Sequence, residues 1–138
     1  MMNRQKVLSF IVIVIFFSLI FALLFSLSMH KVLNNDEHQF IASAKLLESK
    51  SLLPYKDYPY FHLPNLIFIY GALFNFSKYL LFTGRLFSVL CATATLATIF
   101  FVAYGLFARQ SYFIRFVLGI SSVMLILTNP AAFVFLTI

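Results

Sequence analysis

Several features that are common in soluble proteins are scarce or missing in this chain. Charged residues make up only 10% of its 138 residues, while 62% are hydrophobic. A soluble domain has about a quarter of its residues charged and about half apolar. The composition therefore excludes an ordinary soluble core and predicts a membrane-embedded chain. Tryptophan is absent, so the seven tyrosines would have to supply any aromatic belt at the lipid–water interface.

The sequence also lacks most of the motifs that identify enzymes and metal sites. It has no glycine-rich phosphate loop, no G-x-S-x-G and no H-E-x-x-H. Its single cysteine, Cys91, permits no internal disulfide, and the three histidines do not have metal-ligand spacing with it. We therefore expect no metal site and no required cofactor.

Basic residues outnumber acidic ones, with ten Lys/Arg against four Asp/Glu and a net charge of +6. The basic residues stand singly between apolar runs, a pattern typical of topology determinants and interface anchors. Membrane lipid with anionic headgroups is the expected partner, and nucleic acid is not.

Three apolar runs are candidate transmembrane helices. Residues 7–29 contain no charge over 23 residues, enough to cross the roughly 30 Å hydrocarbon core at about 1.5 Å per residue. Residues 86–107 and 116–129 form the second and third candidates. Arg4 and Lys6 precede the first run, which is longer than the roughly 7–15 apolar residues of a signal peptide. We expect a retained anchor whose N-terminus is cytoplasmic.

The only long polar stretch, residues 30–62, holds all four acidic residues and all three histidines. Within it, residues 37–50 have the apolar spacing of an amphipathic helix, which we expect to lie along the membrane surface. Residues 63–77 are apolar, but 15 residues of helix rise only about 22 Å. They predict a juxtamembrane or re-entrant helix, and extension to residue 82 would make a full crossing.

These patterns together predict an all-α integral membrane protein, a single membrane domain over residues 1–138. It has three transmembrane helices plus interfacial or juxtamembrane helices in the first outer loop, and a fourth transmembrane helix is the alternative. Clustering of the unpaired Arg109 and Arg115 with the cytoplasmic N-terminus favours three. We expect the cell (inner) membrane, with residues 30–62 extracytoplasmic. Because the sequence stays apolar to its last residue, we also expect an N-terminal fragment of a longer chain.

Candidate functional residues lie in or beside the polar loop, and each also has a structural interpretation. Asp36 can cap the helix that follows, with Gln39 reaching back in a capping box. Asp57 suits a turn, His62 can satisfy a nearby carbonyl, and Arg85 can extend to lipid headgroups.

A functional interpretation treats the same residues as one site. A carboxylate at the outer edge of the bilayer can act as general base for an incoming hydroxyl, and nearby basic groups can hold a lipid-linked phosphate. On this interpretation Asp36 is the candidate base and Glu37 the alternative. Asp57, His62 and Arg85 are candidate substrate-binding residues.

An ordered set of short motifs strengthens the functional interpretation. In sequence order it comprises Asp36-Glu37, Ala44-Lys45-Leu46-Leu47, Leu53-Pro54-Tyr55-Lys56-Asp57, Pro64 and Arg85-Leu86. In this order and spacing, over about residues 7–130, the chain resembles the N-terminal part of GT-C superfamily membrane glycosyltransferases. Protein O-mannosyltransferases and aminoarabinose transferases are the most similar in pattern. The chain departs from their "PPL" helix start, where it has Leu63-Pro64-Asn65.

The resemblance implies an inverting enzyme that moves a sugar from a polyprenyl-phosphate donor to an acceptor hydroxyl on the outer membrane face. It implies that Asp36 is the base and that residues 63–77 form a juxtamembrane helix. Such enzymes have more spans than this chain, so it is expected to be incomplete and inactive alone. The alternative is a small non-enzymatic membrane protein, such as an accessory subunit or a lipid-sugar flippase.

Overall fold

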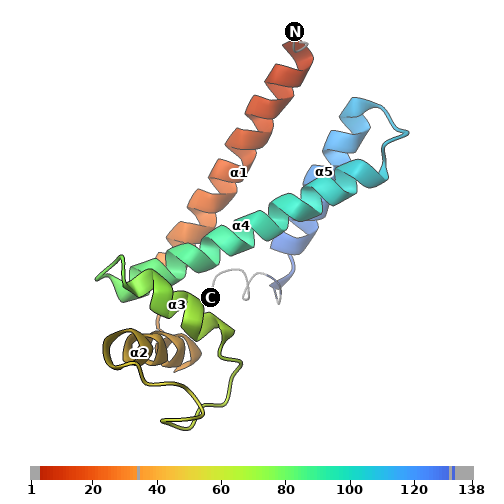
Figure 1. Cartoon of the computed structure of the whole chain (residues 1–138). Helices are drawn as coiled ribbons and strands as arrows, with labels where there is room; N and C mark the ends of the chain where they lie inside the picture. The colour runs from red at the N-terminus through yellow and green to blue at the C-terminus, as the bar shows by residue number, and fades with distance from the viewer. Residues whose placement is uncertain (1–3, 34, 131, 133–138) are drawn as a thin grey trace. The chain divides into compact units, whose positions relative to one another are not determined.

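The structure, a computed structural model, describes residues 4–33, 35–130 and 132. Within them the chain is helical and contains no β-strand, which confirms the all-α prediction. In the described residues five α-helices follow one another (Figure 1): α1 Arg4–His30, α2 Asn35–Lys50, α3 Asn65–Phe74, α4 Leu80–Leu106 and α5 Tyr112–Leu127.

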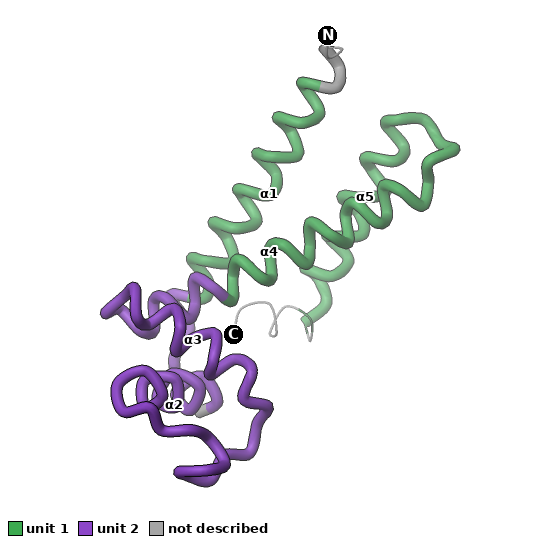
Figure 2. The backbone as a smooth tube through the Cα atoms, viewed as in Figure 1, with its two compact units in different colours: residues 1–28, 88–138 green, residues 29–87 purple. Residues whose placement is uncertain are grey.

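Two compact units divide the chain, and α4 runs through both (Figure 2). Unit 1 comprises Met1–Ser28 and Ser88–Ile138, and so contains nearly all of α1, most of α4 and α5. Unit 2 is Met29–Phe87, which holds α2, α3 and the first residues of α4. Each unit has its own hydrophobic core.

The core of unit 1 joins its three helices around one phenylalanine. Phe100 of α4 is 1% exposed, and its ring meets the rings of Phe17 from α1 and Phe116 from α5 edge-to-face. Such edge-to-face pairs contribute about 0.5–1.5 kcal/mol beyond the area they bury. Leu24 and Val123 are fully buried in the same cluster. Aromatic side chains thus form much of the contact among α1, α4 and α5.

Two of the helices are long and apolar enough to cross a membrane by length and composition: residues Val7–His30 of α1, and α4. They correspond to the predicted runs at 7–29 and 86–107, although α4 begins six residues earlier than predicted. The predicted run at 116–129 falls on α5, whose 16 residues rise about 24 Å. Its crossing stays a prediction.

The region 63–82 does not form the single long helix on which the four-helix alternative depends. The α3 helix has only 10 residues, about 15 Å, and ends at Phe74. The Asn75 side-chain amide donates to the Gly71 carbonyl oxygen at 3.1 Å and so satisfies an acceptor at the end of the helix. A new helix begins only at Leu80. The short helix predicted at 63–77 is present, and the continuous one is not.

The α2 helix matches the predicted 37–50 at its C-terminal end. It ends at Lys50, and Ser51 follows with φ 54°, the left-handed conformation that terminates many helices. The Ser51 amide donates to the Leu47 carbonyl oxygen at 3.0 Å, the bond of the αL motif at helix ends, and the Leu52 amide donates to the Leu46 carbonyl oxygen. The polar segment after α2 therefore starts at a defined turn.

Replacing Gly119 by alanine is expected to destabilise unit 1 by about 1–3 kcal/mol. A Cβ at this position in α5 would lie 2.7 Å from the Phe100 ring, which is fully buried and cannot move aside cheaply. The matched control is Gly105→Ala on α4, where a Cβ meets nothing within 4 Å and helix propensity favours alanine. Thermal unfolding in detergent micelles checks both. Equal stabilities for the two variants would contradict the packing described for Phe100.

Candidate functional site

The candidate site lies in unit 2, where α2 and α3 pack against each other. Ala44 of α2 and Ile67 of α3 are fully buried in the core of this unit. The helices approach closely because Gly71 has no side chain: a Cβ there would lie 3.1 Å from Leu47. This contact gives the polar residues at the start of α2 a rigid support.

An ion pair connects the start of α2 to α4. The Arg85 guanidinium donates from Nε to Glu37 Oε1 at 2.7 Å and from Nη2 to Oε2 at 2.9 Å. The two side chains are only 5% and 12% exposed. Bidentate pairs of this kind are short, strong and geometrically specific. Glu37 and Arg85, predicted as an alternative base and a substrate-binding residue, are therefore held by each other.

Asp36 has a different environment from its neighbour. Its side chain is 66% exposed, and its Oδ1 lies 3.9 Å from Nε2 of His62. Because α2 begins at Asn35, Asp36 lies inside its first turn, and the capping box with Gln39 stays a prediction. The positive end of the helix dipole still favours a carboxylate here. The structure brings together two predicted residues, Asp36 and His62.

The remaining predicted residue, Asp57, has a local role in the described part of the chain. Its Oδ2 accepts a hydrogen bond from the Leu53 amide at 2.7 Å, and its own amide donates to the Leu53 carbonyl oxygen at 2.9 Å. Paired bonds of this kind fix the turn between α2 and α3. Asp57 shapes the segment that carries the tyrosines and His62.

An aromatic cluster surrounds His62. Its ring packs against the rings of Phe40 and Tyr60, and the Tyr55 hydroxyl donates to its carbonyl oxygen. Tyr60 in turn meets Tyr55 and Tyr58 edge-to-face. These contacts fix the position of the imidazole beside Asp36.

Sequence reasoning missed the tyrosines of this cluster as site residues, since it counted them only as a membrane belt. A usable signal was present in "YPYFH". In an extended segment alternate residues differ in exposure, so Tyr58, Tyr60 and His62 are expected to be more buried than Phe61. Their exposures agree, because Tyr60 is 8% exposed and Phe61 88%.

Burial raises the pKa of Tyr60 from 10.0 to about 12, with smaller contributions from Tyr58, Tyr55 and Asp36. Folding therefore favours the neutral phenol. This contribution to stability is fully present below pH 10 and is lost as the pH rises from 10 to about 12.

Tyrosinate absorbance is expected to include a component with a midpoint near pH 12 that the Tyr60→Phe variant lacks. The variant should also lose less stability than the parent chain between pH 10 and 12. A midpoint near 10 for the component that Tyr60→Phe removes would contradict the burial of this phenol.

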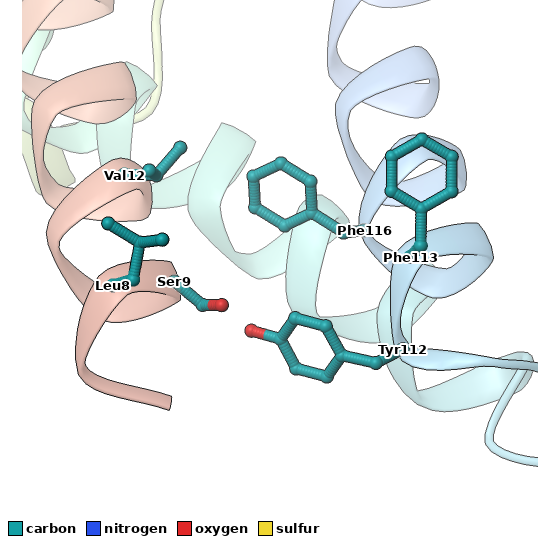
Figure 3. Close-up of a pocket in the computed structure, with 6 residues that line it drawn as sticks. All are labelled: Leu8, Ser9, Val12, Tyr112, Phe113 and Phe116. Atoms are coloured by element: carbon teal, nitrogen blue, oxygen red, sulfur yellow. The ribbon is translucent and has the colours of Figure 1, made fainter. Parts of the chain in front are cut away.

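A separate cavity of about 380 Å³ lies in unit 1 between α1 and α5 (Figure 3). Leu8 and Val12 of α1 and Phe113 and Phe116 of α5 line it, and the Phe116 ring points toward α1. The hydroxyls of two further lining residues, Ser9 of α1 and Tyr112 of α5, point toward each other in Figure 3. Its walls are otherwise apolar, so it offers shape and hydrophobic surface but few groups for chemistry.

Among the described residues, no group of three or more His, Cys, Asp and Glu side chains is arranged to hold a metal ion. Comparison with protein-family models, with curated proteins and with solved structures finds no match to this chain.

Proposed function

We propose that the chain is the N-terminal part of an inverting membrane glycosyltransferase. It contributes to transfer of a sugar from a polyprenyl-phosphate donor to an acceptor hydroxyl on the outer face of the membrane. In this proposal Asp36 is the general base that takes the proton from the acceptor hydroxyl. The lipid-linked donor and membrane lipid are the partners.

One observation carries the proposal: two adjacent carboxylates have opposite environments. Glu37 is nearly buried and occupied by Arg85, whereas Asp36 is exposed beside His62. A general base must be within reach of the acceptor hydroxyl, and the exposed carboxylate of Asp36 meets this requirement. The ordered motif set that begins at this pair supports the assignment of the reaction class.

Arg85 acts as a positioning residue in this proposal and is no longer needed as a phosphate ligand. Its guanidinium holds Glu37, and the adjacent peptide fixes the backbone from which the Asp36 side chain extends. His62 lies close enough to Asp36 to orient the carboxylate or to receive a proton from it after a small movement.

The proposal places the chain in the cell (inner) membrane with a cytoplasmic N-terminus. Residues 7–29, 86–107 and 116–129 cross the bilayer, and α2 and α3 lie at its outer surface. The two helices long enough to cross support this arrangement. Asp36 follows the first of them by six residues, which places its carboxylate near the outer headgroups.

Single-cysteine labelling in whole cells tests this arrangement. With Cys91 replaced by alanine, Lys56→Cys should react with a membrane-impermeant thiol reagent, because the turn after α2 is exposed and extracytoplasmic. Gln110→Cys, in the exposed turn between α4 and α5, should react only after the cells are opened. Labelling of both sites in intact cells would support four crossings and contradict the proposed three.

The function itself is tested with membranes from cells that produce the protein in its native length and from cells that lack its gene. When the membranes are incubated with polyprenyl-phosphate that carries a labelled sugar, label should reach an acceptor only in the membranes that contain the protein. Equal transfer in both, with any background enzymes removed, would contradict a glycosyltransferase.

A further inference from the structure

A cavity of about 290 Å³ in unit 2 lies between α2 and the segment 58–61 that follows the Asp57 turn. Its volume is close to the lower end of the roughly 300–1,000 Å³ range of small-molecule pockets. His38, Gln39 and Ser43 line one side, and Tyr58, Tyr60 and Phe61 line the other. Both sides belong to unit 2.

Two lining residues bury polar atoms that have no hydrogen-bond partner in the described part of the chain. These are the phenolic oxygens of Tyr58 and Tyr60. A buried hydroxyl without a partner costs free energy, and native structures leave few such groups. A phenol is protonated at neutral pH, so each hydroxyl can donate as well as accept.

Two exposed residues of the lining, Phe61 and Gln39, add an aromatic ring and an amide to the two phenols. Phe61 is 88% exposed and lines the cavity, so its ring is open to a ligand. Gln39 is exposed on α2 across from it and offers both amide donors and a carbonyl acceptor. The lining therefore combines one open aromatic face, two phenols and a planar amide.

We propose that this cavity binds a saccharide ring. A pyranose has an apolar C–H face that suits an exposed aromatic ring and a rim of hydroxyls that can both donate and accept. Once a small movement of the wall opens a path to them, a ring hydroxyl would provide the partner that the buried phenols of Tyr58 and Tyr60 lack. An alkyl chain would leave both phenols without one.

The cavity is next to the residue assigned as base. Asp36, Gln39 and Ser43 follow one another at helical spacing of three and four residues, so they lie along one side of α2. Asp36 is also close enough to Tyr60 to raise its pKa. Resting on the proposed function, the inference makes the bound ring part of the acceptor, which is then a sugar whose hydroxyl faces Asp36.

Binding is tested on the 138-residue chain in lipid nanodiscs, without donor, by saturation-transfer difference NMR. The probes are the methyl glycosides of glucose, galactose, mannose and N-acetylglucosamine at millimolar concentration, with cyclohexylmethanol as an apolar ring of similar size. At least one glycoside should bind in preference to cyclohexylmethanol. In tyrosine-labelled protein the same glycoside should shift the signals that Tyr58→Phe and Tyr60→Phe remove.

Phe61→Ala should weaken glycoside binding by about tenfold, the loss of one aromatic contact. Gln39→Ala should weaken it by a similar factor. Phe76→Ala is the matched control, because Phe76 is 90% exposed but does not line the cavity. All three side chains are on the surface, so the fold should survive each change.

Three results would each overturn the saccharide assignment. These are no binding of any glycoside, binding of cyclohexylmethanol equal to that of the glycosides, and glycoside binding that Phe61→Ala leaves unchanged. The donor-free assay separates this outcome from the function. Sugar transfer by cell membranes without glycoside binding would remove only the cavity assignment. Glycoside binding without transfer would leave a saccharide site in a protein that is not a transferase.

Discussion

Replacing Arg85 by methionine is expected to lower the free energy of unfolding by about 3–5 kcal/mol, the cost of breaking a buried ion pair from one side. Methionine keeps much of the length of arginine but leaves the Glu37 carboxylate 12% exposed without its bidentate donor. A buried charge that loses its partner costs far more than the pair contributes when intact.

Two further variants show whether the charge or the packing is responsible. Lys45→Met breaks the exposed pair between Lys45 and Glu48 and should cost less than about 1 kcal/mol. The double variant Glu37→Leu with Arg85→Met removes both charges and should recover a substantial part of the loss. Denaturation in mixed detergent micelles, followed by circular dichroism, measures all three.

An Arg85→Met variant as stable as Lys45→Met would mean that the Glu37–Arg85 pair does not hold the start of α2. The fixed position of Asp36 would then lose its support. Recovery in the double variant would instead identify the uncompensated Glu37 charge as the cause.

The helices themselves could largely be predicted from the sequence. The uncharged run at 7–29 and the amphipathic pattern at 37–50 correspond to α1 and α2, because both depend on local composition and period. The α4 helix begins six residues before the predicted run at 86–107, which starts directly after the charged Arg85. Its partner Glu37 lies 48 positions away, and no local pattern reveals that such a partner allows arginine inside the helix.

The candidate site was predicted as a set of residues but not as an arrangement. Glu37 pairs with Arg85 and Asp36 lies beside His62, and no local pattern in the sequence indicates either pairing. The pairing depends on the fold of the whole of unit 2, in which α2 meets both α4 and the segment after the Asp57 turn. The phenols of Tyr58 and Tyr60 were missed for the same reason, since their burial depends on that packing.

The second large effect is a loss of sugar-transfer rate, which is expected from Asp36→Asn in the native-length protein. Asparagine keeps the size and helix position of the side chain but cannot accept a proton at neutral pH. Removing a general base typically lowers a rate by about 10²–10⁴-fold. Because Asp36 is 66% exposed, the variant should remain as stable as the parent protein.

Glu48→Gln provides the matched control, a carboxylate on the same helix that pairs only with its exposed neighbour Lys45 among the described contacts. It should leave the rate unchanged. Glu37→Gln tests the alternative base and should act mainly through stability, since Glu37 is occupied by Arg85.

The central claim, that the exposed carboxylate of the pair is the base, is tested most directly by the rate of sugar transfer from a polyprenyl-phosphate donor in Asp36→Asn membranes. The account predicts a loss of at least about 100-fold with unchanged protein abundance. Transfer at the parental rate, or a loss confined to a stably folded Glu37→Gln variant, would contradict it.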